Sequence, residues 1–455
     1  MVAVGSCPLS CSVSYGDASM VLGYETKTID VPVPVPPIIE SIAPPGFLKS
    51  LGPGLVTGAA DDDPSGIATY SQVGAQFGYG LAWTMLFSFP LMAVIQAVSA
   101  RIGCVTGFGI AQNLRRHYSP WLLRAVVLLL VVANVINLGA DLGAMGAALG
   151  LLIGGPHHLY TVSFGVVCIL LETFMSYARY AAVLKWATLS LFAYVAVVFA
   201  AHVPWGTALY STVVPHFVLD APHAMALVAV LGTTISPYLF FWQAGQEVEE
   251  LHRRHVKALC ITPRVAGPEL ARIRTDTIVG MGISNLIALF IIFATAATLN
   301  ANGVTDIQTS SQAAEALRPI AGIFTFALFA AGIIATGMLA VPVLAGSAAY
   351  GVSEVFGWTE GLDRRPREAK AFYATIAVAT LGGVALNFTS LDPVKALYLS
   401  AVVNGVLAAP LMAVMMVIAM NPRIMGRLTL PLPMLVVGWL ATAVMALATA
   451  VFFFI

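Results

Sequence analysis

The chain has 455 residues, of which 59% are hydrophobic and only 10% charged, against about 25% charged in an ordinary soluble domain. Its mean hydropathy of +0.87, with apolar runs of about eighteen residues or more after residue 47, is typical of helices that cross a bilayer. Because 22 basic residues are balanced by 22 acidic ones, the charge favours no nucleic-acid partner. The composition therefore predicts an all-α polytopic membrane protein rather than a soluble enzyme.

The first segment, residues 1–46, lacks the basic stretch and apolar core of a signal peptide. Between Val31 and Pro37 proline alternates with valine, a pattern that favours an extended polyproline conformation. We expect a flexible cytoplasmic arm over 1–46 and a transmembrane transporter domain over 47–455.

Apolar segments in the remainder predict eleven transmembrane helices. They fall at 52–78, 81–112, 121–153, 158–178, 181–203, 222–250, 273–299, 319–356, 370–389, 394–420 and 430–455. Basic residues favour cytoplasmic loops, and a cytoplasmic N-terminus puts all 22 of them on that side except Arg318 and Lys395. One missed helix would place every later loop on the wrong side and would remove this uneven distribution of basic residues. We therefore predict a cell-membrane protein with a cytoplasmic N-terminus and an extracytoplasmic C-terminus.

The first span is interrupted by three consecutive carboxylates, Asp61, Asp62 and Asp63, followed by Pro64 and Gly66. Each ionised group at mid-membrane costs about 2.5–3.5 kcal/mol if it faces lipid, and proline removes a helical donor. Irregular backbone at this depth survives only where it is buried in protein or lines a wet cavity. The pattern predicts a broken helix beside a cavity. The alternative is that Asp63 and Pro64 are only the N-cap and first residue of a helix that begins there.

The sixth span carries a similar interruption, because small and hydroxylic residues, including Thr233 and Ser236, precede Pro237. Breaks in the first and sixth spans are typical of a five-plus-five inverted repeat with its substrate between the two unwound segments. The predicted parts are repeat one at about 52–203, repeat two at about 222–420 and an extra helix at about 430–455.

Carboxylates beside unwound carbonyls make an oxygen cage suited to a cation. An organic-solute symporter of the same fold is the alternative transporter, although three aspartates argue against an anionic substrate. Neither a His-Glu-x-x-His nor a Gly-x-Ser-x-Gly pattern occurs, so we predict no enzyme.

From about residue 45 to its end the chain resembles the Nramp family of divalent-metal transporters. Gly52-Pro-Gly54 followed by Asp63-Pro64 is similar to the family's Asp-Pro-Gly-Asn motif, Pro237-Tyr238 stands where the family has Met-Pro-His, and Asn404 with Pro410 resembles its tenth span. The resemblance implies a LeuT-type fold, in which the first, second, sixth and seventh spans rock against the others to give alternating access.

Two departures from the family motif bear on the ion. The asparagine is replaced by Gly66 and the methionine, a soft ligand that favours manganese and iron, by Ser236. A hydroxyl is a hard ligand, and Mg²⁺ prefers oxygen and keeps several waters, so the pattern resembles the Nramp-related magnesium transporters. The metal ligands that it implies are Asp63 as the main one, with Asp62, Gly66, Thr233 and Ser236.

A third departure concerns protons. The family's histidine is Tyr238 here, and although Asp141 remains, the glutamate one turn later is Ala144. Without these relays we expect import of Mg²⁺ and/or Mn²⁺ without obligatory proton coupling; the alternative is a proton-coupled Mn²⁺/Fe²⁺ symporter. We expect no cofactor and a monomeric transport unit. Residues expected to line or gate the pathway are Asp61, Tyr238, Asp141 and Asn404.

Two polar groupings allow more than one interpretation. Asp141 shares a helical face with Asn134 and Asn137, which indicates either interhelical hydrogen bonds or a wet pathway. The acidic end of the sixth span indicates either a solvated terminus paired with Arg253 and Arg254 or a vestibule that concentrates cations. Its polar residues are Gln243, Gln246, Glu247, Glu249 and Glu250.

Overall fold

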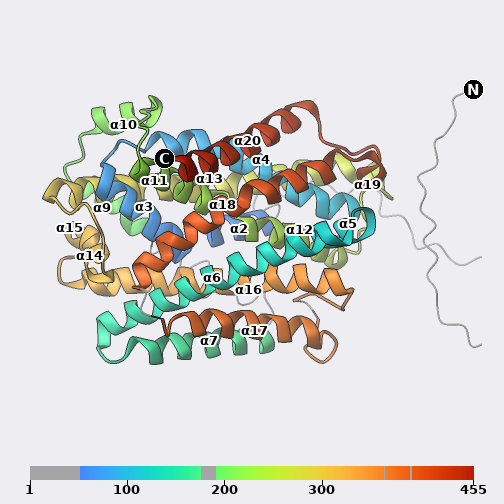
Figure 1. The fold of residues 1–455 in the computed structure, drawn as a ribbon, viewed down its shortest axis with the longest axis horizontal. Coiled ribbons are helices and arrows are strands. Elements are labelled where there is room, and N and C mark those ends of the chain that lie inside the picture. The colour runs from blue at the N-terminus through green and yellow to red at the C-terminus, as the bar shows by residue number, and fades with distance from the viewer. Residues whose placement is uncertain (1–51, 176–190, 363, 390–391) are drawn as a thin grey trace, which may run out of the picture. The chain divides into compact units, whose positions relative to one another are not determined.

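A computed structural model describes residues 52–175, 191–362, 364–389 and 392–455 (Figure 1). The ordered elements in these ranges are all helices, which confirms the predicted all-α class. The predicted arm over 1–46 lies outside the described residues, as do parts of the predicted fourth and fifth spans.

Most predicted spans correspond to one long helix. These are α4 (Trp83–Thr106), α6 (Pro120–Ile153), α7 (His157–Phe174), α13 (Ala266–Thr298), α16 (Thr325–Phe356), α17 (Lys370–Leu386), α18 (Pro393–Met420) and α20 (Leu432–Phe454). In the predicted fifth span, the described residues form the nine-residue helix α9 (Phe192–Ala200). Among the described residues, eight helices are long and apolar enough to cross a membrane. The predicted count of eleven stays a prediction, because the fifth span is only partly described.

The first span is broken, as predicted, into α2 (Pro53–Asp61) and α3 (Pro64–Phe77). Asp62 leaves the helical region at φ −82° and ψ 47°. Asp63 is extended at φ −70° and ψ 170°, and its side chain accepts a hydrogen bond from the Gly66 amide. Asp63 is therefore an N-cap with Pro64 at the first helical position, but a separate helix precedes it. The N-cap at Asp63 and the broken helix, which the sequence analysis treated as alternatives, therefore occur together.

The sixth span is broken in the same way, into α11 (Ala221–Thr234) and α12 (Pro237–Arg253). Ile235 and Ser236 adopt extended or irregular dihedrals, and Pro237 starts the second half because its missing N–H would be unpaired there anyway. Both predicted breaks are confirmed.

Short helices lie wholly or partly outside the predicted spans, among them α14 (Ser310–Ala314) and α19 (Pro422–Met425). The second span, predicted to reach residue 112, ends earlier, at Gly107, whose φ of 70° is left-handed, and the short helix α5 (Ile110–His117) follows. Between the fifth and sixth spans lies α10 (Trp205–Val213), which the search for long apolar runs passed over because it is short.

The long helices form two contacting groups. Helices α6, α7, α16 and α17 pack against one another (Figure 1), and in a second group both α12 and α13 contact α2 and α4. The second group contains the second and seventh spans and one half each of the broken first and sixth spans. The ends of α4, α12 and α16 meet the starts of α5 and α13 at what we call the basic end. It carries Arg115, Arg116, Arg253, Arg254 and Arg364.

Candidate cation site

The two breaks lie against each other inside the protein. The Tyr238 hydroxyl, at the start of α12, is 3.0 Å from the carbonyl oxygen of Ala60 and 3.2 Å from Asp63 Oδ2. The other two helix ends, those of α3 and α11, are also close, because a Cβ placed on Gly66 of α3 would lie 3.2 Å from Thr233 Oγ1 of α11. Four helix ends, those of α2, α3, α11 and α12, therefore converge on one buried region.

Asp63 is the carboxylate that faces the meeting point. Its side chain is 2% exposed, and Oδ1 is held by the Gly66 amide at 2.6 Å. Oδ2 lies 3.1 Å from Asn137 Nδ2 and 3.2 Å from the Tyr238 hydroxyl. The Tyr238 hydroxyl has a single hydrogen, which it can donate either to the Ala60 carbonyl or to Asp63 Oδ2. Asp63 Oδ2 can therefore accept a further partner.

Asn137, on α6, joins Asp63 to the residues predicted to line the pathway. Its Nδ2 also donates to Asp141 Oδ2 at 3.2 Å, so the two amide hydrogens serve two carboxylates. Its Oδ1 accepts from Asn404 Nδ2 at 3.2 Å. Asp141 and Asn404 are thus linked to Asp63, through a residue that the predicted site left out.

Asp61 and Asp62 point to a different helix. The Ser284 hydroxyl, on α13, is 2.7 Å from Asp61 Oδ2 and 3.1 Å from Asp62 Oδ1. One hydroxyl hydrogen can satisfy only one of these carboxylates at a time, and Asp61 Oδ1 is buried without a hydrogen-bond partner. Ser284 was also missed by the sequence analysis, because a lone serine in an apolar span carries no distinctive signal.

The second break contributes uncharged oxygens. Ser236 Oγ lies 2.9 Å from the carbonyl oxygen of Gly232 and 2.8 Å from that of Thr233. The hydroxyl hydrogen is used by one of these carbonyls, which leaves the oxygen lone pairs available. Thr233 and Ser236 are both buried.

The three aspartates, Asp61, Asp62 and Asp63, have no basic partner among the residues that the structure describes. In that part of the chain, no three His, Cys, Asp or Glu side chains are placed together to hold a metal. A cation bound here would therefore be coordinated by one or two carboxylates together with carbonyl, hydroxyl or water oxygens, which is a hard-ligand set.

Known proteins with similar sequences decide the family. A family profile described as natural resistance-associated macrophage protein-like, or Nramp, matches residues 54–454. The chain belongs to the Nramp family. The divalent metal cation transporter MntH of Verminephrobacter eiseniae is 28% identical to this Nramp protein over 301 residues, which are 64% of this chain and 65% of the relative. MntH of Klebsiella pneumoniae strain 342 is 27% identical over 87% of this chain and 92% of its own length.

Solved structures share the fold of this Nramp protein. The Eremococcus coleocola manganese transporter gives a TM-score of 0.72 at 17% identity, covering 90% of this chain and 88% of that one. Mhp1, a nucleobase-cation-symport-1 family transporter, gives 0.54 at 16% identity, with coverages of 88% and 92%. Together with the two breaks, this confirms the LeuT-type fold. The chain is a multi-pass membrane protein, and because its curated relatives are transporters, the prediction that it is no enzyme is confirmed.

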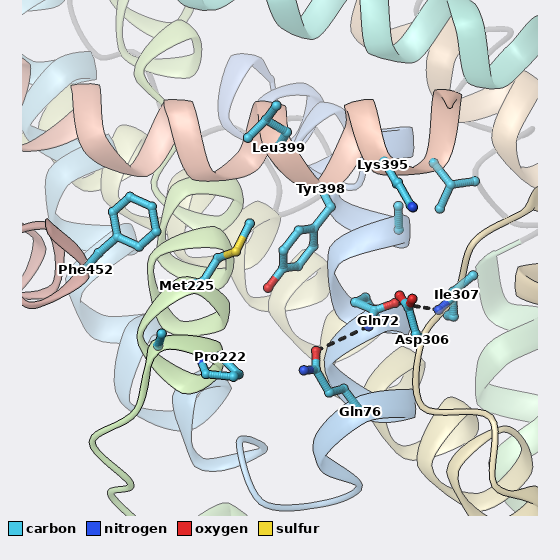
Figure 2. Close-up of a pocket in the computed structure, with 13 residues that line it drawn as sticks. Gln72, Gln76, Pro222, Met225, Asp306, Ile307, Lys395, Tyr398, Leu399 and Phe452 are labelled. Carbon is cyan, nitrogen blue, oxygen red and sulfur yellow. Dashed lines mark hydrogen bonds between the residues drawn. The ribbon is translucent and has the colours of Figure 1, made fainter. Parts of the chain in front are cut away.

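A cavity of about 610 Å³ lies at the opposite end from the basic end (Figure 2). Gln72 and Gln76 of α3, Met225 of α11 and Tyr398 of α18 line it. A second cavity of only about 10 Å³ shares Ala68 and Val394 with it and is lined mostly by apolar side chains, including Ile67 and Leu397. That space is about the smallest that can hold one water molecule.

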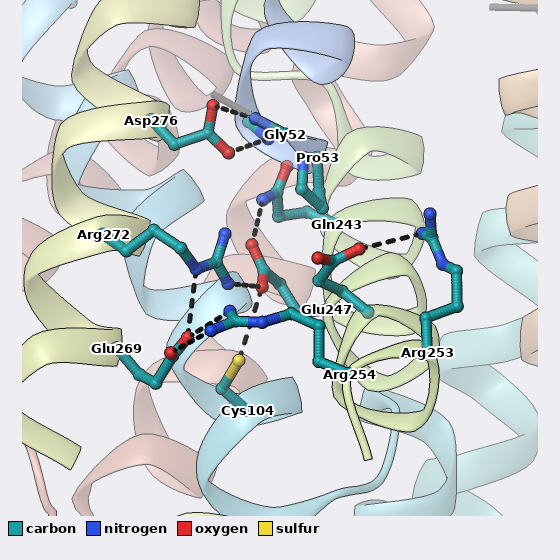
Figure 3. Close-up of polar contacts among 12 residues, drawn as sticks. Gly52, Pro53, Cys104, Gln243, Glu247, Arg253, Arg254, Glu269, Arg272 and Asp276 are labelled. Atoms are coloured by element: carbon teal, nitrogen blue, oxygen red, sulfur yellow. Dashed lines mark hydrogen bonds and ion pairs between the residues drawn. The ribbon is translucent and has the colours of Figure 1, made fainter. Parts of the chain in front are cut away.

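The basic end is closed by a buried ionic network (Figure 3). Arg272 Nη2 is 2.7 Å from Glu247 Oε2, and Arg272 Nε is 3.0 Å from Glu269 Oε2. Arg254 forms a two-pronged pair with Glu269 at 2.6 and 2.8 Å. Gln243 Nε2 donates to Glu247 Oε1 at 3.2 Å. The network joins α12 to α13.

This network corrects the interpretation of the sixth span's end as a solvated terminus. Glu250 does pair with Arg253, at 3.2 Å. Glu247, however, is 0% exposed and pairs with Arg272, 25 residues away. The sequence analysis considered only basic residues next to the end of the sixth span, so it could not find Arg272, which lies on α13.

Proposed function

We propose that this protein imports a divalent metal cation, Mg²⁺ and/or Mn²⁺, across the cell membrane by alternating access without obligatory proton coupling. The observation that carries the proposal is the meeting of two helix breaks around buried carboxylates that lack a basic partner. Such carboxylates require protons or an exchangeable cation to offset their charge. The names of the curated relatives, divalent metal cation transporters, support the cation.

Asp63 is the main ligand in this proposal, because its Oδ2 faces the junction of all four helix ends. Asp62, the backbone at Gly66, the Thr233 carbonyl and the Ser236 hydroxyl complete the set, and water supplies the remainder. Asp61, Tyr238, Asp141 and Asn404 border the pathway. A Cβ on Gly66 would lie 3.2 Å from both the Asp61 carbonyl oxygen and Thr233 Oγ1, so the absence of a side chain there lets the two breaks approach closely. The hard oxygens of this set favour a partly hydrated Mg²⁺.

The membrane potential can drive import by itself. A divalent ion that enters through about 100 mV, negative inside, gains roughly 4.6 kcal/mol, which corresponds to more than about a thousandfold accumulation. Tyr238 and Ala144 stand where the family has titratable relays, so little remains to couple protons to the ion.

The remaining parts of the proposal concern placement. The basic end faces the cytoplasm, because basic residues concentrate on that side of a bilayer, and the cavity of about 610 Å³ opens outward. One chain is the transport unit, since all of the proposed ligands come from it.

Uptake of Mg²⁺ and Mn²⁺ into proteoliposomes, driven by an inside-negative potential, tests the proposal. Asp63→Ala should reduce uptake by more than about 100-fold, because losing a ligand exceeds the 10–100-fold loss typical of its supporting partners. The control is Glu315→Ala, which removes a partly exposed acid from a surface ion pair and should leave uptake unchanged.

Two additions to this assay separate the alternatives. The signal of a pH-sensitive dye inside the vesicles should stay constant during uptake. Acidification of the vesicle interior in step with Mn²⁺ entry would establish a proton-coupled symporter instead. Competition by Mg²⁺, Fe²⁺ and Ca²⁺ ranks the ions. If Mg²⁺ fails to compete at millimolar levels, the hard-ligand argument is wrong.

A further inference from the structure

Two long segments of the chain carry positive charge and no acidic residue. Residues 64–140 contain four arginines, and residues 393–455 contain two arginines and one lysine, but neither range contains an aspartate or a glutamate. Because the whole chain is neutral, the acidic residues that balance these charges lie in other segments. A surface built from both ranges is therefore positively charged and favours an anionic partner.

The two segments meet at the basic end. The hydroxyl of Tyr118, which follows α5, donates to the Val417 carbonyl of α18 at 3.5 Å and accepts from Asn421 Nδ2 at 3.4 Å. Asn421 also caps α19, because its Oδ1 accepts from the Arg423 amide at 3.0 Å. Helices α6 and α18 contact each other, and α5 and α19 lie at the same end of the protein (Figure 1). The start of α6 and the end of α18 are therefore neighbours.

Exposed apolar side chains form a strip on each of these two helix ends. On α6, Trp121, Arg124 and Leu128 are exposed and lie three and four residues apart, so they share one face. The exposed fraction is 80% for Trp121 and 64% for Leu128. On α18, Val417 and Met420 are also exposed and three residues apart. In a multi-pass membrane protein, such apolar strips mark a surface that contacts lipid.

Arginines stand where these strips reach the end of the helices. Arg124 and Arg423 are exposed, and neither forms an ion pair with a described residue. A helical side chain leans towards the N-terminus of its helix, and a long arginine can extend its charged group to the membrane surface. The Arg124 guanidinium can thus reach from the strip on α6 to the level of the helix end, where α19 carries Arg423.

The neighbouring residues fit the same depth. Trp121 and Tyr118 lie beside the arginines, and tryptophan and tyrosine are enriched at the level of lipid headgroups. A guanidinium binds phosphate through two parallel hydrogen bonds. Arg116 and Arg427, exposed on the same two segments, add positive charge. The surface therefore combines an apolar part, an aromatic border and a phosphate-binding group in the order found along a phospholipid.

We propose that the start of α6 and the end of α18 form a binding site for an anionic phospholipid. Its phosphate lies between Arg124 and Arg423, and its acyl chains run along the strips that contain Leu128, Val417 and Met420. The arginines select a negative headgroup, and the apolar strips select a lipid over a soluble anion. This inference goes beyond the proposed function, because it concerns a lipid held at the surface of the protein and not the transported ion.

Competition between two lipids tests the inference. Purified full-length protein in detergent is mixed with equal amounts of phosphatidylglycerol and phosphatidylcholine that have the same acyl chains, and native mass spectrometry counts the bound lipids. We expect phosphatidylglycerol to be retained over phosphatidylcholine. Arg124→Gln combined with Arg423→Gln should weaken phosphatidylglycerol binding about 25-fold, since each basic residue near an anionic lipid contributes about 1 kcal/mol, or about fivefold. Binding of phosphatidylcholine should stay the same.

A matched pair of substitutions controls for net charge. Arg365→Gln combined with Arg367→Gln removes the same charge from exposed residues between α16 and α17, and it should leave phosphatidylglycerol binding unchanged. Equal losses in the two double variants, or no preference for phosphatidylglycerol in the parent protein, would overturn the proposal. Gel filtration and thermal melting check that each variant is folded.

Two further arms identify what the arginines recognise. Arg124→Lys combined with Arg423→Lys keeps the positive charge and should retain most of the preference for phosphatidylglycerol; a loss as large as that with glutamine would contradict a site based on charge. Millimolar inorganic phosphate should not displace the lipid, because it has no acyl chain to contact the strips. Displacement by phosphate would show a site for a free anion instead. Because uptake is not measured, these results are independent of the proposed function.

Discussion

Buried carboxylates occur in two regions of this protein with opposite surroundings. At the basic end, Glu247 and Glu269 are matched by Arg272 and Arg254. At the helix breaks, Asp61, Asp62 and Asp63 are as deeply buried, but no arginine, lysine or histidine of the described chain pairs with them. Among the described residues, the buried carboxylates at the basic end have basic partners, whereas those at the breaks have none.

The comparison separates two kinds of buried carboxylate. A carboxylate that has a fixed basic partner has its charge offset within the protein, and the pair joins the two helices that carry it. Under the proposed function, a carboxylate supported only by hydroxyl and amide hydrogens keeps its affinity for a cation and can release it again. The carboxylates of the two regions are alike in burial and charge, and they differ only in whether a basic side chain pairs with them.

The largest effect should come from breaking the network at the basic end. Arg272→Ala leaves Glu247 buried without a counter-charge, which should lower the free energy of unfolding by about 3–5 kcal/mol. The matched control is Arg318→Ala, whose pair with Glu315 is exposed and contributes about 0–1 kcal/mol. Thermal melting in detergent compares them. Equal shifts for the two variants would mean that the buried pair is not structural.

The next effect concerns the amide that supports the proposed main ligand. Asn137→Ala removes the donor to both Asp63 and Asp141, and loss of such a supporting partner should reduce Mn²⁺ uptake by about 10–100-fold. Asn134→Ala, one turn away, removes donors to Leu344 and Ser347 instead, and it should reduce uptake far less. If both variants transport equally, Asn137 is only a packing residue.

Much of this arrangement could be predicted from the sequence, because prolines, glycines and carboxylates within apolar spans leave few alternatives. The breaks beside Pro64 and Pro237, and the direction of Asp63 towards the second break, follow from that pattern. The separation of Asp63 from Asp61 and Asp62 does not, since it depends on the rotation of each helix end. Ser284 escaped notice, and Asn137 was named without its partner Asp63, because each acts on a helix more than 70 residues away.

A smaller effect should come from changing the ligand chemistry at the second break. Ser236→Cys exchanges a hard oxygen for a softer sulfur with little change in size, so competition should shift about tenfold towards Mn²⁺ and Cd²⁺ over Mg²⁺. Ser400→Cys, which alters a hydroxyl bonded to Leu397 of α18, is the control and should leave the ranking unchanged. An unaltered ranking in both variants would remove Ser236 from the ligand set.

The smallest effect concerns a carboxylate that lies outside the spans and forms no ion pair with any described residue. Glu360 follows α16, and its Oε2 is buried without a hydrogen-bond partner. Burial first, and then the neighbouring Glu354 and Glu249, raise its pKa from 4.5 to about 9. The folded protein therefore keeps a proton on Glu360 that the unfolded chain loses above about pH 4.5.

Since the unfolded state binds fewer protons in that window, the contribution of Glu360 to stability is complete below about pH 4.5 and declines as the pH rises towards 9. The melting temperature should fall between pH 6 and about pH 9, and Glu360→Gln, which remains neutral, should flatten that slope. Glu368 is an exposed residue that lines the same cavity of about 390 Å³ as Glu360, and Glu368→Gln should keep the slope. A slope that is unchanged by Glu360→Gln would mean that this carboxylate is ionised in the folded protein, so that a cation or a basic group, rather than a proton, must offset its charge.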